Sequence, residues 1–112
     1  MPHADVKCSS DLDLDFDAIF AAIEGTIQAH DAGSGDCKCR AYPTNIYRHT
    51  HVLINLAMLT KPHRDDAFTQ NLMNDLEANI KALITQDCFF SLGLAYNDAS
   101  YVTNLHTFEG NG

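Results

Sequence analysis

The sequence contains few basic residues and no long apolar stretch. Seven Lys and Arg residues stand against fifteen Asp and Glu residues, so the formal net charge is -8 at pH 7. This balance excludes a broad positive surface for nucleic acid or anionic lipid. No segment approaches the roughly 20 apolar residues of a membrane helix, and the segment after Pro2 lacks the apolar run of a signal peptide. We therefore expect a soluble cytoplasmic protein with no nucleic-acid or membrane partner.

Cysteine is present but does not form a disulfide framework. The four cysteines are irregularly spaced and have no secretory context, so reduced thiols packed in a core are the expected state: Cys8, Cys37, Cys39 and Cys88. The sequence also lacks a glycine-rich phosphate loop and any recognised motif around a serine or cysteine nucleophile. Phosphate-loop and nucleophilic chemistry therefore have no support.

Two motifs resemble metal sites. The acidic run at 11–15 begins like a calcium loop, but Phe16 replaces the required glycine and Ala22 the closing glutamate, so calcium is rejected. The run instead places negative charge before a helix. "CKC" at 37–39 and "HTH" at 49–51 each present two ligand-type residues, and a zinc site is conceivable only if the two segments pair. Buried cysteines and a histidine pair at the rim are the simpler interpretation, and we expect no metal.

Residues 1–112 are expected to form one domain, since a chain of this length buries a modest core. Alternating polar and apolar residues predict strands, and apolar residues at helical spacing predict helices. The expected elements are strands at 3–8, 37–42, 50–59 and 88–96, and helices at about 16–31 and 64–86, with a C-terminal arm or tail at 97–112.

The order β-α-β-β-α-β predicts an α+β fold made of two crossover units. Right-handed crossovers place both helices on one face of a four-stranded sheet and leave the other face uncovered. Yet the third and fourth strands carry apolar residues on both faces, with Leu53, Ala57, Leu59, Phe89 and Ala95 opposite the core positions. An exposed apolar sheet face marks an interface, so we expect a homo-oligomer.

The second residue raises a specific chemical possibility. Pro2 follows the initiator methionine, and removal of Met1 would turn its nitrogen into a secondary amine that can act as a base. The alternative is that Pro2 only begins a strand, where its missing N–H costs nothing.

"MPH" leading into a strand that ends in "KCSSD", an arginine in the second strand, and "CFFSLGLAY" followed by a short polar tail together resemble the tautomerase superfamily. More narrowly, they resemble the 5-carboxymethyl-2-hydroxymuconate isomerase family, over nearly the whole chain. The resemblance implies a homotrimer with active sites at subunit boundaries and a role in aromatic compound catabolism. It also implies an amino-terminal proline as general base and arginines that hold a carboxylated dienol. Pro2 and Arg40 match two of these residues, and Arg64 is a candidate for another.

The sequence also departs from the family pattern. Lys38 stands where a second arginine of the second strand is expected, and the connection "PTNIYRH" is shorter than in the enzymes of that name. Lysine presents a point charge and cannot make the two-pronged contact of arginine with a carboxylate. The substrate therefore can differ, and the fold transfers more safely than the named reaction.

Independently of the family, the residues suit a proton shift along a conjugated enol. Such a shift needs one base with a pKa near the working pH, and the cations Lys38, Arg40 and Arg64 would favour a neutral prolyl amine. The same cations would bind the carboxylates of a small substrate, without a metal or organic cofactor. The sequence thus predicts a cofactor-independent tautomerase. The alternative is a catalytically silent oligomer that keeps the fold as a binding or structural module, and the roles of Tyr42, His49 and His51 stay open.

Overall fold

The structure, a computed structural model, describes residues 1–108 and contains four strands and two helices in the predicted order. The predicted segment 97–112 therefore lies partly outside the described residues. The elements are β1 (His3–Ser9), α1 (Phe16–His30), β2 (Lys38–Thr44), β3 (His51–Leu59), α2 (Asp66–Lys81) and β4 (Phe89–Asn97).

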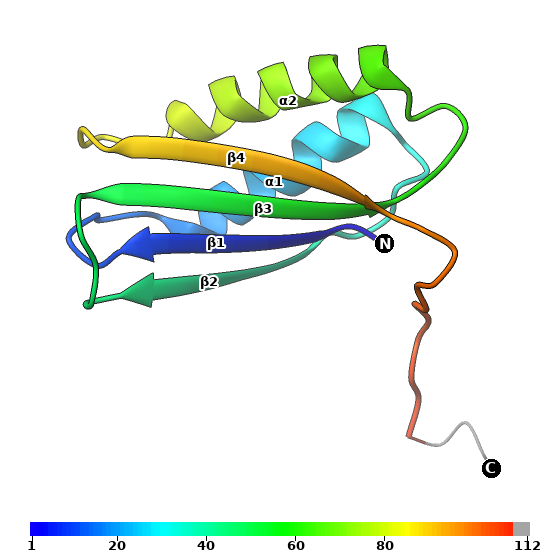
Figure 1. Ribbon diagram of the computed structural model, residues 1–112, viewed down its shortest axis with the longest axis horizontal. Coiled ribbons are helices and arrows are strands. Elements are labelled where there is room, and N and C mark those ends of the chain that lie inside the picture. Colours follow the sequence, from blue (N-terminus) through cyan, green and yellow to red (C-terminus); the bar gives the residue numbers. More distant parts are fainter. Residues whose placement is uncertain (109–112) are drawn as a thin grey trace.

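The strands form one sheet in the order β2-β1-β3-β4, and both helices lie on the same face of it (Figure 1). β1 runs parallel to β2, β3 runs parallel to β4, and the central pair β1 and β3 is antiparallel. Each parallel pair is joined through one helix, which is the crossover arrangement that the sequence predicts. The α+β prediction with two helices on one sheet face is confirmed.

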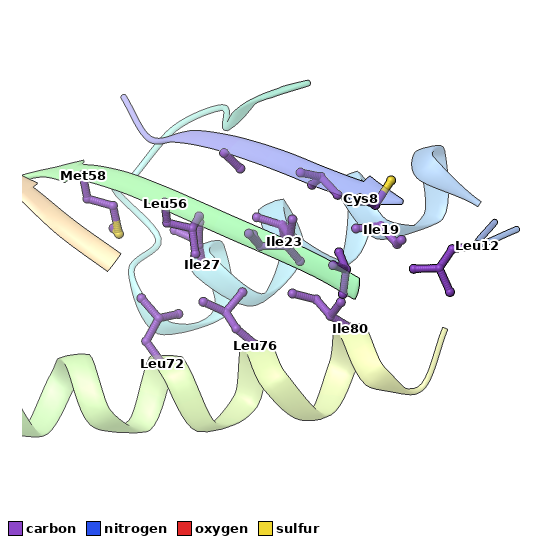
Figure 2. Packing of buried hydrophobic residues seen from close by; sticks show 14 residues of the cluster. Cys8, Leu12, Ile19, Ile23, Ile27, Leu56, Met58, Leu72, Leu76 and Ile80 are labelled. Atoms are coloured by element: carbon purple, nitrogen blue, oxygen red, sulfur yellow. The ribbon is translucent and has the colours of Figure 1, made fainter. Parts of the chain in front are cut away.

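The core lies between this sheet face and the helices. The helices contribute Ile19, Ile23 and Ile27 from α1 and Leu72, Leu76 and Ile80 from α2, all fully or almost fully buried. Their side chains point toward the strands, where Leu56 and Met58 of β3 meet them (Figure 2). Burial of these aliphatic side chains supplies the main driving force for folding, at about 1.5–3 kcal/mol each.

Both helices begin at an aspartate, and one ends earlier than predicted. The carboxylates of Asp15 and Asp65 accept hydrogen bonds from the backbone N–H groups three residues later, at 3.1 and 2.8 Å. Such N-caps satisfy donors that have no partner within the helix. α2 was expected to reach residue 86 but ends at Lys81, because the N–H groups of Leu83 and Ile84 bond three residues back in a tight turn.

The second sheet face is open, and its two halves differ in character. On β1 and β2 it carries charged and polar side chains, among them Asp5, Lys7 and Arg40, whereas β3 and β4 contribute mainly apolar ones. Phe89 is 72% exposed there. The expected apolar open face is thus found on β3 and β4, interrupted by the exposed polar residues Asn55 and Ser91.

β2 continues through Pro43, where a polar connection was expected. β2 is an edge strand, so a residue without an N–H is tolerated there. Residues 98–108 contain no helix or strand, and this segment leads away from the sheet (Figure 1). Within residues 1–108, neither helix combines the length and apolar character needed to cross a lipid bilayer.

Candidate active site

Pro2 lies at one end of the sheet, directly before β1. Its ring is fully buried, and its carbonyl oxygen accepts a hydrogen bond from the Lys38 N–H at 2.9 Å. The next residue, His3, is paired with Lys38 of β2 and with Ala57 of β3. The fold therefore sets Pro2 beside the start of β2 and the end of β3.

A hollow of about 420 Å³ opens on the uncovered sheet face next to this end. Its polar lining comes from three strands: His3 and Asp5 of β1, Arg40 of β2 and Asn55 of β3. Gly93 of β4 also lines it, and a Cβ atom there would lie 3.7 Å from Asn55 Oδ1, an ordinary contact. Side chains on one face of neighbouring strands thus converge on a space large enough for a small organic acid.

Arg40 is the principal cation of this hollow. Its Nε lies 2.7 Å from Asp5 Oδ1 and donates a hydrogen bond to the Tyr42 hydroxyl at 3.1 Å. The Nε–H therefore points at the hydroxyl, and Asp5 Oδ1 accepts no hydrogen bond among the described residues although it is buried. One Nη is 3.2 Å from His3 Nδ1. Two of the five guanidinium donors are engaged in this way, and three can still receive a carboxylate.

The surroundings of His3 favour its neutral form. Burial, and then the positive charge of Arg40, lower the pKa of its imidazole below the usual value. A neutral ring can accept the Arg40 N–H at Nδ1, whereas an imidazolium could not. His3 therefore orients the guanidinium without adding a positive charge at neutral pH.

Lys38 is a second cation near this end of the sheet. It lies two residues before Arg40 on the same strand face, and its side chain is half-exposed. Its ammonium is 3.8 Å from Asp36, an exposed ion pair that costs little to exchange for another anion. The structure thus places Pro2 just before β1 and beside Lys38, and Arg40 two residues further along β2. Of these three residues, Arg40 lines the hollow and the other two do not.

Arg64 is placed differently. Its side chain is 3% exposed and lies in the connection between β3 and α2. Both Nε and Nη2 donate to Asp31 Oδ2, at 3.0 and 2.7 Å, and Nη1 donates to the Leu59 carbonyl at 2.7 Å. Leu59 ends β3, so Arg64 belongs to the Pro2 end of the sheet. It does not line the hollow, and most of its hydrogen-bond donors bind other groups of the chain.

The histidines of "HTH" lie at the other end of the sheet. His49 has a left-handed backbone (φ 67°), and its carbonyl lies 2.8 Å from Nδ1 of His51, which begins β3. β1 lies between β2 and β3 in the sheet. Cys39 of β2 pairs with Ala4 near the start of β1, whereas Val52 of β3 pairs with Cys8 near its end. The two segments therefore do not pair, which removes the basis of the zinc alternative. Within residues 1–108 no three potential ligands cluster.

Sequence reasoning missed His3, Asp5 and Asn55. The alternation of "HADVKC" put His3 and Asp5 on the polar face of β1, and that signal was available. Asn55 interrupts the apolar run "VLINLAML", which is a second available signal, because a lone amide in an otherwise apolar segment marks a position outside the core. Their convergence on Arg40 depends on the strand order, which periodicity alone does not determine.

Comparison with known proteins finds structures of the same architecture but no similar sequence. No protein-family model matches the chain, and no curated protein matches it in sequence. Solved structures do match. A 5-carboxymethyl-2-hydroxymuconate delta-isomerase has a TM-score of 0.69 and 19% identity, with 96% of this chain and 88% of the other covered.

Two further solved structures are also similar to this chain. A 5-carboxymethyl-2-hydroxymuconate isomerase from Deinococcus radiodurans R1 has a TM-score of 0.71 at 14% identity, covering 95% of this chain and 90% of the other. A fused 4-OT symmetric trimer has a TM-score of 0.67 at 12% identity, covering 96% and 93%. These identities are low, so the likeness is one of structure. On that basis the fold that the resemblance implies is confirmed, because the chain shares the fold of these isomerase and 4-OT structures.

Proposed function

We propose that this protein is a tautomerase or isomerase that shifts a proton within a small carboxylated oxo-enol, of the 5-carboxymethyl-2-hydroxymuconate type. The general base is the nitrogen of Pro2 after removal of Met1. One observation carries the proposal: in a tautomerase-type fold, Pro2 opens the first strand beside Lys38 and next to a hollow that contains Arg40.

The cations have two tasks in this mechanism. A secondary amine is intrinsically too basic to be neutral at pH 7, and burial and nearby positive charge both lower its pKa. The Pro2 ring is buried, and Lys38 and Arg40 lie on the adjacent strand. The free donors of Arg40 bind a substrate carboxylate, while the positive charges stabilise the dienolate that forms when the proton is removed.

The proton then returns to a different carbon of the same substrate. The prolyl nitrogen takes the proton from one atom of the conjugated system and delivers it to another, so the base is regenerated and no net charge is transferred. We assign carboxylate binding to Arg40 and Lys38. Arg64 contributes at most its remaining donors at the Pro2 end, since Asp31 and the Leu59 carbonyl occupy three of them.

The proposed assembly is a homotrimer. The open sheet face has an apolar half, and the fused 4-OT structure of similar fold is a symmetric trimer. A neighbouring copy packed on this face would exclude water from the hollow, which strengthens each electrostatic interaction inside it.

The test compares processed protein with protein that retains Met1. In the chain with Met1 the Pro2 nitrogen is an amide without a basic lone pair, so we expect turnover only after removal of methionine. The two preparations are distinguished by intact mass, and ketonisation of hydroxymuconates and phenylpyruvate is followed by ultraviolet absorbance. In the processed protein, kcat/KM should rise with pH as the prolyl ammonium loses its proton. Equal rates in the two preparations would remove Pro2 from the mechanism.

A second candidate function is a catalytically silent oligomer that keeps the fold as a binding module. The pairing of the cations favours it: Arg40 contacts Asp5 and Arg64 contacts Asp31 within the chain. Neutralised cations depress the pKa of a neighbouring amine less than free ones do. Binding of a dicarboxylate to the processed protein, without turnover of any oxo-enol, would identify this function.

A further inference from the structure

Two thiols are in contact at the start of β2. The Sγ atoms of Cys37 and Cys39 are 3.6 Å apart, and both side chains are half-buried, so small reagents can reach them. They point toward the helix side of the sheet, opposite to the hollow that contains Arg40. The mechanism proposed above does not use them.

We propose that Cys37 and Cys39 form a redox-active dithiol that a low-molecular-weight disulfide converts reversibly into an intramolecular disulfide. A thiolate of the pair attacks one sulfur of the small disulfide and forms a mixed disulfide, which releases one small thiol. The second cysteine loses its proton, attacks the protein sulfur of the mixed disulfide and releases the second small thiol. The protein dithiol is oxidised and the small disulfide is reduced to two thiols.

The backbone can accommodate this bond. Two residues of extended chain span about 6.6 Å, near the upper end of the Cα separation of about 4.4–6.8 Å seen across disulfides, so bond formation requires the segment to shorten. Cys37 lies just before β2, and β2 is an edge strand with one neighbour. The segment therefore can shorten slightly without breaking a second row of strand hydrogen bonds.

The local environment selects the attacking sulfur. The contact with Cys37 lowers the pKa of the Cys39 thiol, and the positive charge of Arg40 acts in the same direction, against burial and the Glu24 carboxylate. The same contact, together with burial and the carboxylate of Glu24, raises the pKa of the Cys37 thiol. Glu24 also accepts the Cys37 N–H at 2.8 Å. These directions favour Cys39 as the attacking thiolate and Cys37 as the resolving thiol.

Other cysteine pairings are excluded by the fold. Cys8 pairs with Pro43 in β1–β2 register, whereas Cys39 pairs with Ala4, four residues away along β1. That separation is roughly 13 Å, well beyond disulfide range. Cys88 precedes β4 at the opposite edge of the sheet.

The experiment equilibrates the folded protein with mixtures of reduced and oxidised glutathione, quenches with acid and alkylates the remaining thiols. We expect two of the four thiols to become unreactive, with the intact mass reduced by two hydrogen atoms, and full reversal by a reductant. Trypsin cleaves after Lys38 and Arg40, so the bond should join the dipeptide Cys39–Arg40 to the peptide that ends at Lys38.

The variants C37S and C39S should each abolish this linkage and instead retain one glutathione on the remaining cysteine. C88S is the matched control and should leave the linkage unchanged, and circular dichroism verifies that each variant is folded. The inference is overturned if all four thiols of the wild-type protein stay alkylatable, or if the cross-linked peptide persists in C37S. Neither result depends on the proposed tautomerase activity.

Discussion

At the residue scale, the candidate site depends on how each cation is paired. Arg40 and Arg64 both contact a carboxylate, but their surroundings differ: the Arg40 side chain is 43% exposed, whereas that of Arg64 is 3% exposed. The exposed part of the Arg40 side chain is accessible to a substrate, while breaking the buried pair of Arg64 would leave an uncompensated charge. Arg40 is therefore suited to bind a substrate carboxylate, and Arg64 is suited to hold the fold.

Arg40→Ala should reduce kcat/KM for a dicarboxylate substrate by about 10²- to 10³-fold, as expected for loss of one electrostatic donor to the transition state. Arg48→Ala is the control, because Arg48 is an exposed cation of the β2–β3 connection and does not line the hollow. Steady-state kinetics on the processed protein measure both effects. Equal losses in the two variants would mean that the site is misplaced.

The sequence identified the cations but not their partners. Lys38 and Arg40 were found because they alternate on one strand, a local pattern. The partner of Arg64, Asp31, lies 33 residues earlier in the chain, and Asp5 lies 35 residues before Arg40. Contacts at such separations follow from the packing of α1 and from the order β2-β1-β3-β4, which no local periodicity encodes.

At the scale of the elements, periodicity predicted the strands and helices well because their buried faces repeat regularly. The helix α1 ends within one residue of its expected boundary, next to Asp31 and before the glycines at 33 and 35. The end of α2 was missed because the apolar residues Leu83 and Ile84 continue the helical spacing while the backbone turns. Apolar spacing reports which residues face the core, and not whether the helix hydrogen bonds continue.

Asp31 links two elements, and this gives a prediction about acid stability. Its Oδ2 accepts hydrogen bonds from His63 at 2.8 Å and from Arg64, which joins the end of α1 to the β3–α2 connection. These hydrogen bonds, first from His63 and then from Arg64, together with the Arg64 charge, lower the pKa of Asp31 to about 2. Because the folded pKa is below the unfolded value near 4, the ionised carboxylate stabilises the fold above pH 4.

This stabilisation, on the order of 2 kcal/mol, should be lost as the pH falls from 4 to 2. Asp31→Asn should therefore lower the free energy of unfolding at pH 7, and its difference from the wild type should shrink toward pH 2. Urea denaturation, monitored by circular dichroism, measures the free energy of unfolding at both pH values. Asp75→Asn is the matched control, since Asp75 makes an exposed pair with His30 and should matter much less. A difference from the wild type that is unchanged at pH 2 would contradict this role.

At the scale of the whole molecule, the open sheet face determines how copies can associate. Its β1–β2 half carries Asp5, Lys7 and Arg40, and its β3–β4 half carries Leu53, Ala57 and Phe89. Burying the apolar half removes hydrophobic surface from water, whereas burying the charged half requires matched partners. A closed ring satisfies both demands if one copy's apolar half forms the interface while the charged half, with the adjoining Asn55 and Gly93, lines a pocket at its border.

We therefore expect light scattering at micromolar concentration to give a trimer of the 12.4 kDa chain. Phe89→Glu should shift the protein toward the monomer, because a carboxylate buried in an apolar interface has no partner to offset its desolvation. Ile46→Glu is the control, since Ile46 is 87% exposed but belongs to the β2–β3 connection and to no strand of the sheet. A wild-type protein that is a stable, soluble monomer would refute the burial of this face.

Because the proposed site needs a neighbouring copy to exclude water, turnover in Phe89→Glu should fall together with the trimer fraction, and should recover at protein concentrations that restore the assembly.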